Sequence, residues 1–356
     1  MIFRSGWIFT AAFFAGTLGA APAQAKTPAS VKKAASAKKA AGPIVLGTTQ
    51  LAGDFGKVGT TYTIGKSTPI NFTLKSAEYS VVPFTVGLNT WQPRGDEKLL
   101  VLRYTVHNPM PREQSYSWSD IRFTAVDAKD INHEFIQAVV REGDTQPLSI
   151  SLKPAQKLDV VTAIVVPAMG VVPKLIVLRE SGAPVVRYAL SGNVKPLPAN
   201  VADASDASGA TARKEVPAQR DIFYATGVFD TRLDEVAYVD GPLLGRAPGE
   251  NNRYITTIFT IKNRSQGTQR YVWSDFLPDL RDADGESASY TQALLKATRD
   301  ESTYGELAPG EEARIRFFFP LPKSVAGKTL KLSEGKQIDA RVARVFAFDL
   351  SDAPAK

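Results

Sequence analysis

Apolar and polar residues alternate with a period of two in four stretches of the chain. These stretches are residues 100–107, 160–166, 255–262 and 315–321. A period of two places successive side chains on opposite faces of a β-strand, so each stretch predicts a strand with one buried face and one wetter face. Shorter apolar runs predict further strands at residues 175–178, 185–188, 330–332 and 344–348.

Turn signals separate these strands. Proline presets φ in residues 152–155 (LKPA) and 307–310 (LAPG), and residues 127–130 (DAKD) and 282–285 (DADG) have the composition of hairpin turns. Helix signals are weak by comparison. Short strands separated by turns at this spacing predict an all-β protein built from antiparallel β-sandwiches.

Two regions of the chain match each other at a fixed offset. Asn263 lies 155 positions after Asn108, and at the same offset residues 118–120 and 273–275 both read Trp-Ser-Asp. Shared residues that keep one register over such a length indicate duplication, and units of this size are domains rather than short solenoid repeats. We therefore expect two tandem sandwich domains.

The boundaries of these domains follow from composition. The stretch 192–219 is rich in Ala, Pro, Ser and Asp, which is typical of a flexible linker. We expect the first domain at residues 44–191 and the second at residues 220–356.

The order of motifs within each copy resembles a known family. A strand ends in Asn (YTVHN, FTIKN), a D-x-x-[DG] hairpin and an L-x-P-[AG] turn follow, and a later apolar strand ends at proline. This order is similar to that of the secreted bacterial immunoglobulin-like domains of unknown function, which include small secreted immunogenic proteins. The likeness covers about residues 95–190 and 250–350. It implies two immunoglobulin-like sandwiches outside the cytoplasm, with no known activity and no catalytic residues.

The N-terminus has the three parts of an export signal. Arg4 supplies a positive charge, an apolar run follows from Trp7 to Ala21, and Ala23-Gln24-Ala25 provides small residues for cleavage. We expect residues 1–25 to be a signal peptide, and the protein to be periplasmic or extracellular. No later segment is apolar enough to predict a membrane span.

Positive charge is concentrated next to this signal. Residues 1–43 hold six of the 43 Lys and Arg residues and no Asp or Glu, so residues 44–356 carry 37 basic against 36 acidic residues. This near-neutral balance argues against nucleic acid as a partner. Residues 26–43 are predicted to be disordered. We interpret them as a spacer; the alternative is weak contact with an anionic surface through Lys32, Lys33, Lys38 and Lys39.

Few residues are suited to catalysis or metal binding. The chain has no cysteine and two histidines, His107 and His133, which have no partner histidine at metal-ligand spacing. The acidic run 279–286 is interpreted as an ordinary turn rather than a calcium loop, because Asp and Gly are common turn residues. We expect no metal, no cofactor and no enzymatic activity.

Aromatic residues are the remaining candidates for binding. Tyr116 and Trp118 are expected to share one strand face, as are Tyr271 and Trp273 in the second copy. Exposed flat rings suit sugar or peptide ligands. The competing interpretation, which the sequence favours, is that these rings cover the end of the core.

Together these features predict an exported, non-catalytic binding protein of the cell envelope or extracellular space, which contacts an envelope protein or a glycan through loops or sheet edges. The alternatives are a carbohydrate-active or other hydrolytic enzyme with a site between the domains, and a purely structural spacer. The four rings Tyr116, Trp118, Tyr271 and Trp273 are the candidate ligand surface.

Overall fold

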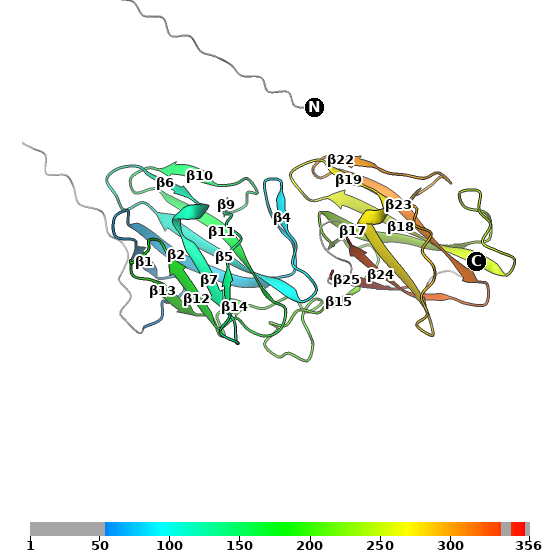
Figure 1. Cartoon of the computed structure of the whole chain (residues 1–356), viewed down its shortest axis with the longest axis horizontal. Helices are drawn as coiled ribbons and strands as arrows, with labels where there is room; N and C mark the ends of the chain where they lie inside the picture. Colours follow the sequence, from blue (N-terminus) through cyan, green and yellow to red (C-terminus); the bar gives the residue numbers. More distant parts are fainter. Residues whose placement is uncertain (1–53, 336–342, 353–356) are drawn as a thin grey trace, which may run out of the picture. The chain divides into compact units, whose positions relative to one another are not determined.

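The computed structural model describes residues 54–335 and 343–352 (Figure 1). The expected signal peptide (1–25), the Lys/Ala-rich segment (26–43) and the start of the first expected domain (44–53) lie outside the described residues. Within the described part, no helix is long and apolar enough to cross a membrane. The structure is built from strands, which confirms the predicted all-β, antiparallel class.

The first sandwich has one large sheet and one smaller sheet. The large sheet has the order β1-β2-β5-β11-β9, and β14 pairs with β2. Its strands are β1 (Thr61–Ile64), β2 (Ile70–Ser80), β5 (Glu97–His107), β9 (Val140–Arg141), β11 (Lys157–Pro167) and β14 (Val194–Lys195). The smaller sheet has the order β13-β12-β7-β8, with strands β7 (Arg122–Val126), β8 (Asn132–Glu134), β12 (Lys174–Leu178) and β13 (Val186–Ala189).

Two separate pairs of strands complete the first sandwich. They are β3 (Phe84–Val86) with β4 (Asn89–Trp91), and β6 (Gln114–Ser117) with β10 (Ser149–Leu152).

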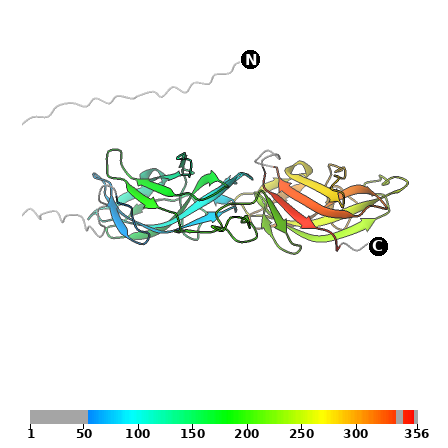
Figure 2. The same ribbon diagram turned by 90° about the horizontal axis from the view of Figure 1, so that it is seen from below.

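Aromatic rings join the two sheets of this sandwich. Phe123 of the smaller sheet lies 6.0 Å from Phe72 and 5.0 Å from Tyr104 of the large sheet, measured between ring centroids. All three rings are fully buried. Figure 2 gives a second view of the same layers. Every second residue of β5 and β7 points into this core, so the alternation in the sequence marks the buried face of each strand, as predicted.

The second sandwich has the same two-layer plan. Its large sheet has the order β16-β17-β18-β23-β21 and its smaller sheet the order β15-β25-β24-β20. The large sheet contains β16 (Tyr224–Ala225), β17 (Phe229–Val239), β18 (Asn252–Asn263), β21 (Leu295–Lys296) and β23 (Glu312–Pro322). The smaller sheet contains β15 (Glu215–Ala218), β20 (Phe276–Asp282), β24 (Gly327–Glu334) and β25 (Val345–Asp349), and a separate pair joins β19 (Gln269–Tyr271) to β22 (Gly305–Leu307).

Rings also join the layers of the second sandwich. Phe276 of the smaller sheet lies 5.8 Å from Phe229 and 5.9 Å from Phe317 of the large sheet. Phe348 of the smaller sheet lies 5.6 Å from Phe259 of the large sheet. Each of these rings is almost completely removed from water, so burial of large apolar side chains is the main source of stability in this core.

Both large sheets contain a β-bulge with a charged residue. The register shifts around Lys75 in β2 and around Asp234 in β17. Lys75 Nζ lies 3.2 Å from Asp159 Oδ2, whereas Asp234 Oδ2 lies 3.3 Å from Arg314 Nε. The extra residue of a bulge turns its side chain out of the regular alternation, so each charge reaches a partner two strands away in the sheet. The sign of the charge at the bulge is opposite in the two sheets.

The asparagines that end the long strands have a structural role. Asn108 is fully buried, and its amide nitrogen donates to the carbonyl oxygens of Leu152 at 2.9 Å and Arg112 at 2.8 Å. Asn263, also fully buried, donates to the carbonyl oxygens of Leu307 and Gly267 at 2.8 and 2.7 Å. These contacts fasten each loop that follows a long strand to the next turn, which explains why both copies of the motif end in Asn.

The stretch 192–219 is not the flexible linker that its composition suggests. Its two ends are strands: β14 pairs in parallel with β2, and β15 pairs in parallel with β25. Between them, Ala202 and Ala212 form a β-bridge, and both alanines are buried. The small side chains, whose abundance predicted a flexible linker, instead pack closely in the structure. The prediction of a flexible linker at 192–219 is therefore wrong.

A buried lysine holds this stretch in place. The side chain of Lys98 is completely buried, and its ammonium group donates to the carbonyl oxygens of Ala168, Gly170 and Ala210. The nitrogen also lies 4.3 Å from the centre of the Tyr79 ring, within cation–π range. Burial lowers the pKa of Lys98 to about 8. Ala210 lies between β14 and β15, within residues 196–213, which we call the 196–213 segment. Lys98 therefore connects the 196–213 segment to the large sheet.

Candidate functional site

The two Trp-Ser-Asp motifs form single turns of 3₁₀ helix, η1 (Trp118–Asp120) and η2 (Trp273–Asp275). The aspartate of each motif reaches back to the start of its turn. Ser117 N donates to Asp120 Oδ2 at 2.7 Å, and Val272 N donates to Asp275 Oδ2 at 2.9 Å. These bonds satisfy a backbone donor that would otherwise lack a partner at the start of the turn, so the aspartates fix the backbone conformation of both motifs.

The tryptophans of these turns face solvent. Trp118 is 46% exposed and Trp273 is 43% exposed. Tyr116 and Tyr271, two residues earlier in each copy, are only 1% and 7% exposed. The expected common strand face is therefore wrong, because β6 ends at Ser117 and the turn redirects the next side chain. The tyrosines belong to the core, and the tryptophans alone remain available for contact.

Tyr116 supports the turn from inside the sandwich. Its hydroxyl lies 2.8 Å from the hydroxyl of Tyr104, and both rings are buried. Burial raises the pKa of the Tyr116 phenol, so this hydroxyl stays protonated and acts as a structural hydrogen-bonding group.

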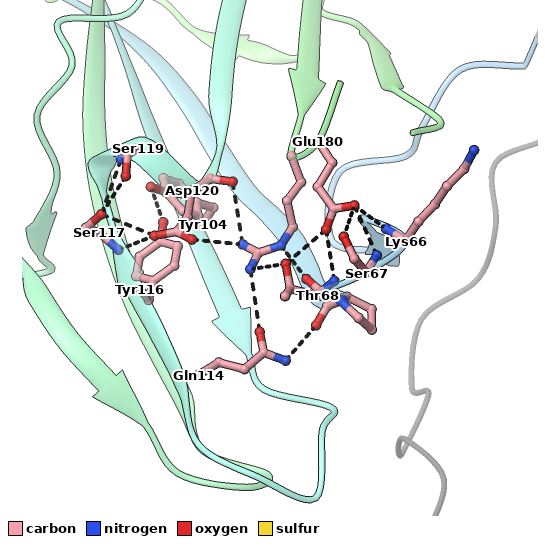
Figure 3. Close-up of polar contacts among 12 residues, drawn as sticks. Lys66, Ser67, Thr68, Tyr104, Gln114, Tyr116, Ser117, Ser119, Asp120 and Glu180 are labelled. Atoms are coloured by element: carbon pink, nitrogen blue, oxygen red, sulfur yellow. Dashed lines mark hydrogen bonds and ion pairs between the residues drawn. The ribbon is translucent and has the colours of Figure 1, made fainter. Parts of the chain in front are cut away.

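A buried arginine connects the first turn to the rest of its sandwich; its partners Asp120, Thr68 and Gln114 are labelled in Figure 3. The side chain of Arg179 is 3% exposed, and its Nη1 lies 3.6 Å from Asp120 Oδ1. Its Nε donates to the carbonyl oxygen of Thr68 at 2.5 Å, and its Nη2 donates to Gln114 Oε1 at 3.5 Å. Burial lowers the pKa of Arg179. Three separate segments thus meet at one guanidinium group, which holds the Trp118 turn rigidly.

The neighbouring Glu180 is fully engaged by its own hydrogen bonds. Its carboxylate accepts from the backbone nitrogens of Lys66, Ser67 and Thr68 at 2.9, 3.0 and 2.9 Å, and from the hydroxyls of Ser67 and Thr68, both at 2.9 Å (Figure 3). These bonds hold its pKa well below the usual range of a glutamate. Glu180 therefore stays ionised, and it holds the loop at residues 66–68 in place rather than donating a proton.

Both histidines are engaged with other side chains. His107 is 5% exposed and lies 2.9 Å from the Asn71 amide nitrogen through Nδ1, and burial lowers its pKa. His133 Nε2 lies 2.9 Å from Asp127 Oδ2. The described residues contain no group of three or more His, Asp or Glu side chains arranged to hold a metal ion.

The acidic run 279–286 comprises the end of β20, which runs to Asp282, and the turn that follows it. Asp282 Oδ1 accepts from the backbone nitrogens of Asp284 and Glu286 at 3.0 and 2.9 Å. Asp279 Oδ2 lies 2.9 Å from Arg281 Nε.

Two hollows lie against Trp273. One, of about 440 Å³, is also lined by Arg270, Gln292 and Tyr304. The other, of about 400 Å³, is lined by residues that include Pro278 and again Gln292. Tyr304 is 73% exposed. Trp273 and Gln292 line both hollows, and we call the pair of hollows with these shared residues the Trp273 groove.

Sequence reasoning missed most of this groove. Tyr304 and Gln292 come from separate loops, and nothing in their local sequence indicates that they converge on Trp273. One backbone feature does accompany the site: Gln292 has a φ of 52°, in the left-handed region that non-glycine residues seldom adopt. Gln137, 155 positions earlier, has the same φ of 52°.

Comparison with known proteins adds little about function. No family model matches the chain, and no curated protein matches it. An uncharacterized beta-sandwich protein from Clostridium difficile 630 is 15% identical with a TM-score of 0.29, over 38% of this chain and 96% of that one. The secreted protein MPT63 from Mycobacterium tuberculosis is 13% identical with a TM-score of 0.27, over 37% and 97%. The putative lipoprotein ycdA from Bacillus subtilis is 8% identical with a TM-score of 0.26, over 58% and 74%. Likenesses at this level assign no activity to the chain.

Proposed function

We propose that the chain is an exported, non-catalytic binding protein made of two duplicated immunoglobulin-like modules. Each module presents one tryptophan to a partner in the envelope or extracellular space. The observation that carries this proposal is the pair of exposed rings, Trp118 and Trp273, each held on a one-turn helix fixed by its own aspartate. Exposed aromatic rings on rigid supports are typical anchors of binding surfaces.

Equivalent contacts support the duplication. Lys98 lies over the ring of Tyr79, and Arg253, 155 positions after Lys98, lies 3.8 Å from the centre of the Tyr238 ring. Each tyrosine hydroxyl also accepts a backbone N–H, from Val172 at 2.7 Å and from Gly327 at 3.1 Å. The bulges, the strand-ending asparagines and the 3₁₀ turns recur in the same way. A shared ancestor for the two modules accounts for all of these pairs.

The engagement of the polar side chains supports a binding role rather than catalysis. In the described part of the chain, the residues best suited to acid–base chemistry are used for structure: Glu180 clamps a loop, and each histidine has a side-chain partner. A catalytic group needs a pKa near the working pH and room for a substrate. The tryptophans, by contrast, have no evident role in the core.

The N-terminal sequence supports export. The charged start, apolar run and small-residue site of residues 1–25 have the pattern of an export signal, and such a signal would bring the modules to envelope proteins and glycans.

Capture of partners from a native envelope fraction tests this function. The bait is the chain from Lys26 onward, compared with its Trp118→Ala/Trp273→Ala variant and with a chain starting at Gly42. Met169→Ala is the matched control, because Met169 is an 81% exposed apolar residue outside both turns. We expect a protein or glycan that is retained by the wild type, the shortened chain and the control, and lost with the folded double variant. Equal capture by all four, or by none, would overturn the proposal.

A further inference from the structure

We propose that the Trp273 groove is a saccharide-binding site for a short chain of pyranose rings. This inference rests on the proposed binding function and identifies a ligand class for one of its two tryptophans. It depends on three features: two exposed aromatic rings that line one hollow, polar side chains beside it, and a sheet edge whose proline disfavours a peptide strand.

Aromatic rings line both hollows of the groove. Trp273 and the 73% exposed Tyr304 line the first hollow, and Trp273 and Tyr290 line the second. The C–H face of a pyranose ring packs against such flat rings, while its hydroxyls need polar partners at the rim. Gln292 lines both hollows and can donate and accept hydrogen bonds. The volumes, about 440 and 400 Å³, accommodate a short chain of sugar units that crosses Trp273.

The groove follows an edge of the second sandwich. Within the described residues, β20 pairs along its length with β24. On its other side, Leu280 O accepts from Ala288 N at 2.8 Å, next to a single bridge between Arg281 and Ser287. Leu280 therefore directs its backbone groups away from β24. In an antiparallel strand, every second residue directs its N–H and C=O to the same side, so Pro278 also faces this outer edge.

Proline at this position disfavours a peptide partner. A peptide that adds as a new strand needs the backbone N–H groups of the edge as donors, and Pro278 has none. Its carbonyl oxygen remains an acceptor. A saccharide hydroxyl can donate to such a carbonyl and has no need of a ladder of alternating donors, so the hydrogen-bonding pattern of this edge fits a sugar better than a strand.

The first sandwich provides an internal contrast. The strand that corresponds to β20 is β7, and its outer edge is covered by β8. Phe123 occupies the position 155 residues before Pro278, and Phe135 N donates to Phe123 O at 3.1 Å. Ser149 occupies the position 155 residues before Tyr304. Trp118 therefore has the same turn as Trp273 without the open edge or the second exposed ring, which makes it a matched control.

The test uses the chain from Lys26 onward and two soluble probes, the β-1,4-linked tetramers of glucose and of N-acetylglucosamine. Binding is measured by calorimetry and by the indole N–H signals in nitrogen–proton NMR spectra. This chain has three tryptophans, Trp91, Trp118 and Trp273, and Trp→Phe variants assign their signals. We expect at least one tetramer to shift the Trp273 signal and to bind at least about tenfold more weakly to Trp273→Ala. We also expect several-fold weaker binding to Tyr304→Ala and a change below about twofold for Trp118→Ala.

The inference would be overturned if neither tetramer shifts the Trp273 signal at millimolar concentration. It would also be overturned if Trp118→Ala weakens sugar binding as much as Trp273→Ala does. A third contrary result is that Pro278→Val creates a binding site for an extended peptide that displaces the sugar. Tyr304→Ala guards against misfolding as an explanation, since a side chain this exposed is not needed for the core. If the saccharide test fails while envelope capture still depends on the tryptophans, the binding function stands with a different ligand. If both fail, the proposed function fails too.

Discussion

Replacing Lys98 with methionine tests how the 196–213 segment is held to the first sandwich. Methionine is similar in length and removes the ammonium group that donates to three carbonyl oxygens. Hydrogen bonds from a charged donor contribute roughly 2 kcal/mol each, or about 6 kcal/mol for three. Burying the charge offsets part of this, because lowering the pKa from 10.5 to about 8 corresponds to about 3 kcal/mol. The expected net loss is therefore about 2–3 kcal/mol.

The loss of stability is confined to the 196–213 segment, so we would measure it by hydrogen exchange with mass spectrometry. Ala212 N donates to Ala168 O, one of the three acceptors of Lys98, and its exchange reports opening of the segment. We expect exchange in residues 196–213 to be roughly 30- to 150-fold faster in Lys98→Met at pH 7, with β17 and β18 unchanged. Lys98→Arg is the control that keeps the charge. Unchanged exchange in the segment would refute the claim that Lys98 holds it.

The pH dependence gives a second test of the same contact. The pKa of Lys98 is lower in the folded than in the unfolded chain, so between about pH 8 and pH 10.5 the unfolded chain binds the extra proton. The free-energy cost of burying the charged Lys98 side chain is therefore present in full below about pH 8, and it decreases as the pH rises. We therefore expect the difference in melting temperature between wild type and Lys98→Met to widen from pH 7 to pH 10. A difference that narrows would mean that the pKa of Lys98 is not lowered in the folded chain.

Three further variants test the supports of the strands and turns. Asn263→Ala should lower the free energy of unfolding by about 2–3 kcal/mol in thermal or urea unfolding, because the carbonyl oxygen of Leu307 loses a buried donor and that of Gly267 keeps only the Ser265 hydroxyl; an effect no larger than that of an exposed Asn→Ala change would contradict this. Asp275→Ala should cost about 1 kcal/mol and make the fluorescence of Trp273 easier to quench, since the bond to Val272 N is lost; unaltered quenching would argue against the support. Glu180→Gln should flatten the acid dependence of melting: the folded pKa of Glu180 is depressed, so its stabilisation is present above its ordinary pKa of 4.5 and is lost as the pH falls below that value. Parallel melting curves for wild type and Glu180→Gln in that range would refute it.

The sequence predicted the strands well because their cause is local. Alternation with a period of two determines which side chains face the core, and the LKPA and LAPG turns end strands wherever the chain goes next. Repetition at a fixed offset also directed attention to Asn108 and Asn263. Their role was not predictable, because one of the carbonyl oxygens that each asparagine binds lies 44 residues further along the chain.

Two errors have physical causes that the sequence only partly reveals. Composition suggested a linker at 192–219, but the contact that orders it joins Lys98 to Ala210, which are 112 residues apart. The face assigned to Trp118 was wrong because the strand was assumed to continue through the motif. Ser117 and Asp120 have the spacing of a capping box, and that signal predicts a turn at Trp118. The second copy has Val272 in place of Ser117 and lacks this signal.

The opposite charges at the two bulges affect how the chain avoids folding errors. Proteins with repeated modules are prone to misassembly in which a strand of one module takes the place of its counterpart in the other. If β17 took the place of β2, Asp234 would lie against Asp159; in the reverse exchange, Lys75 would lie against Arg314. Either product brings like charges together within a sheet. The reversal of sign therefore disfavours an exchange of these two strands.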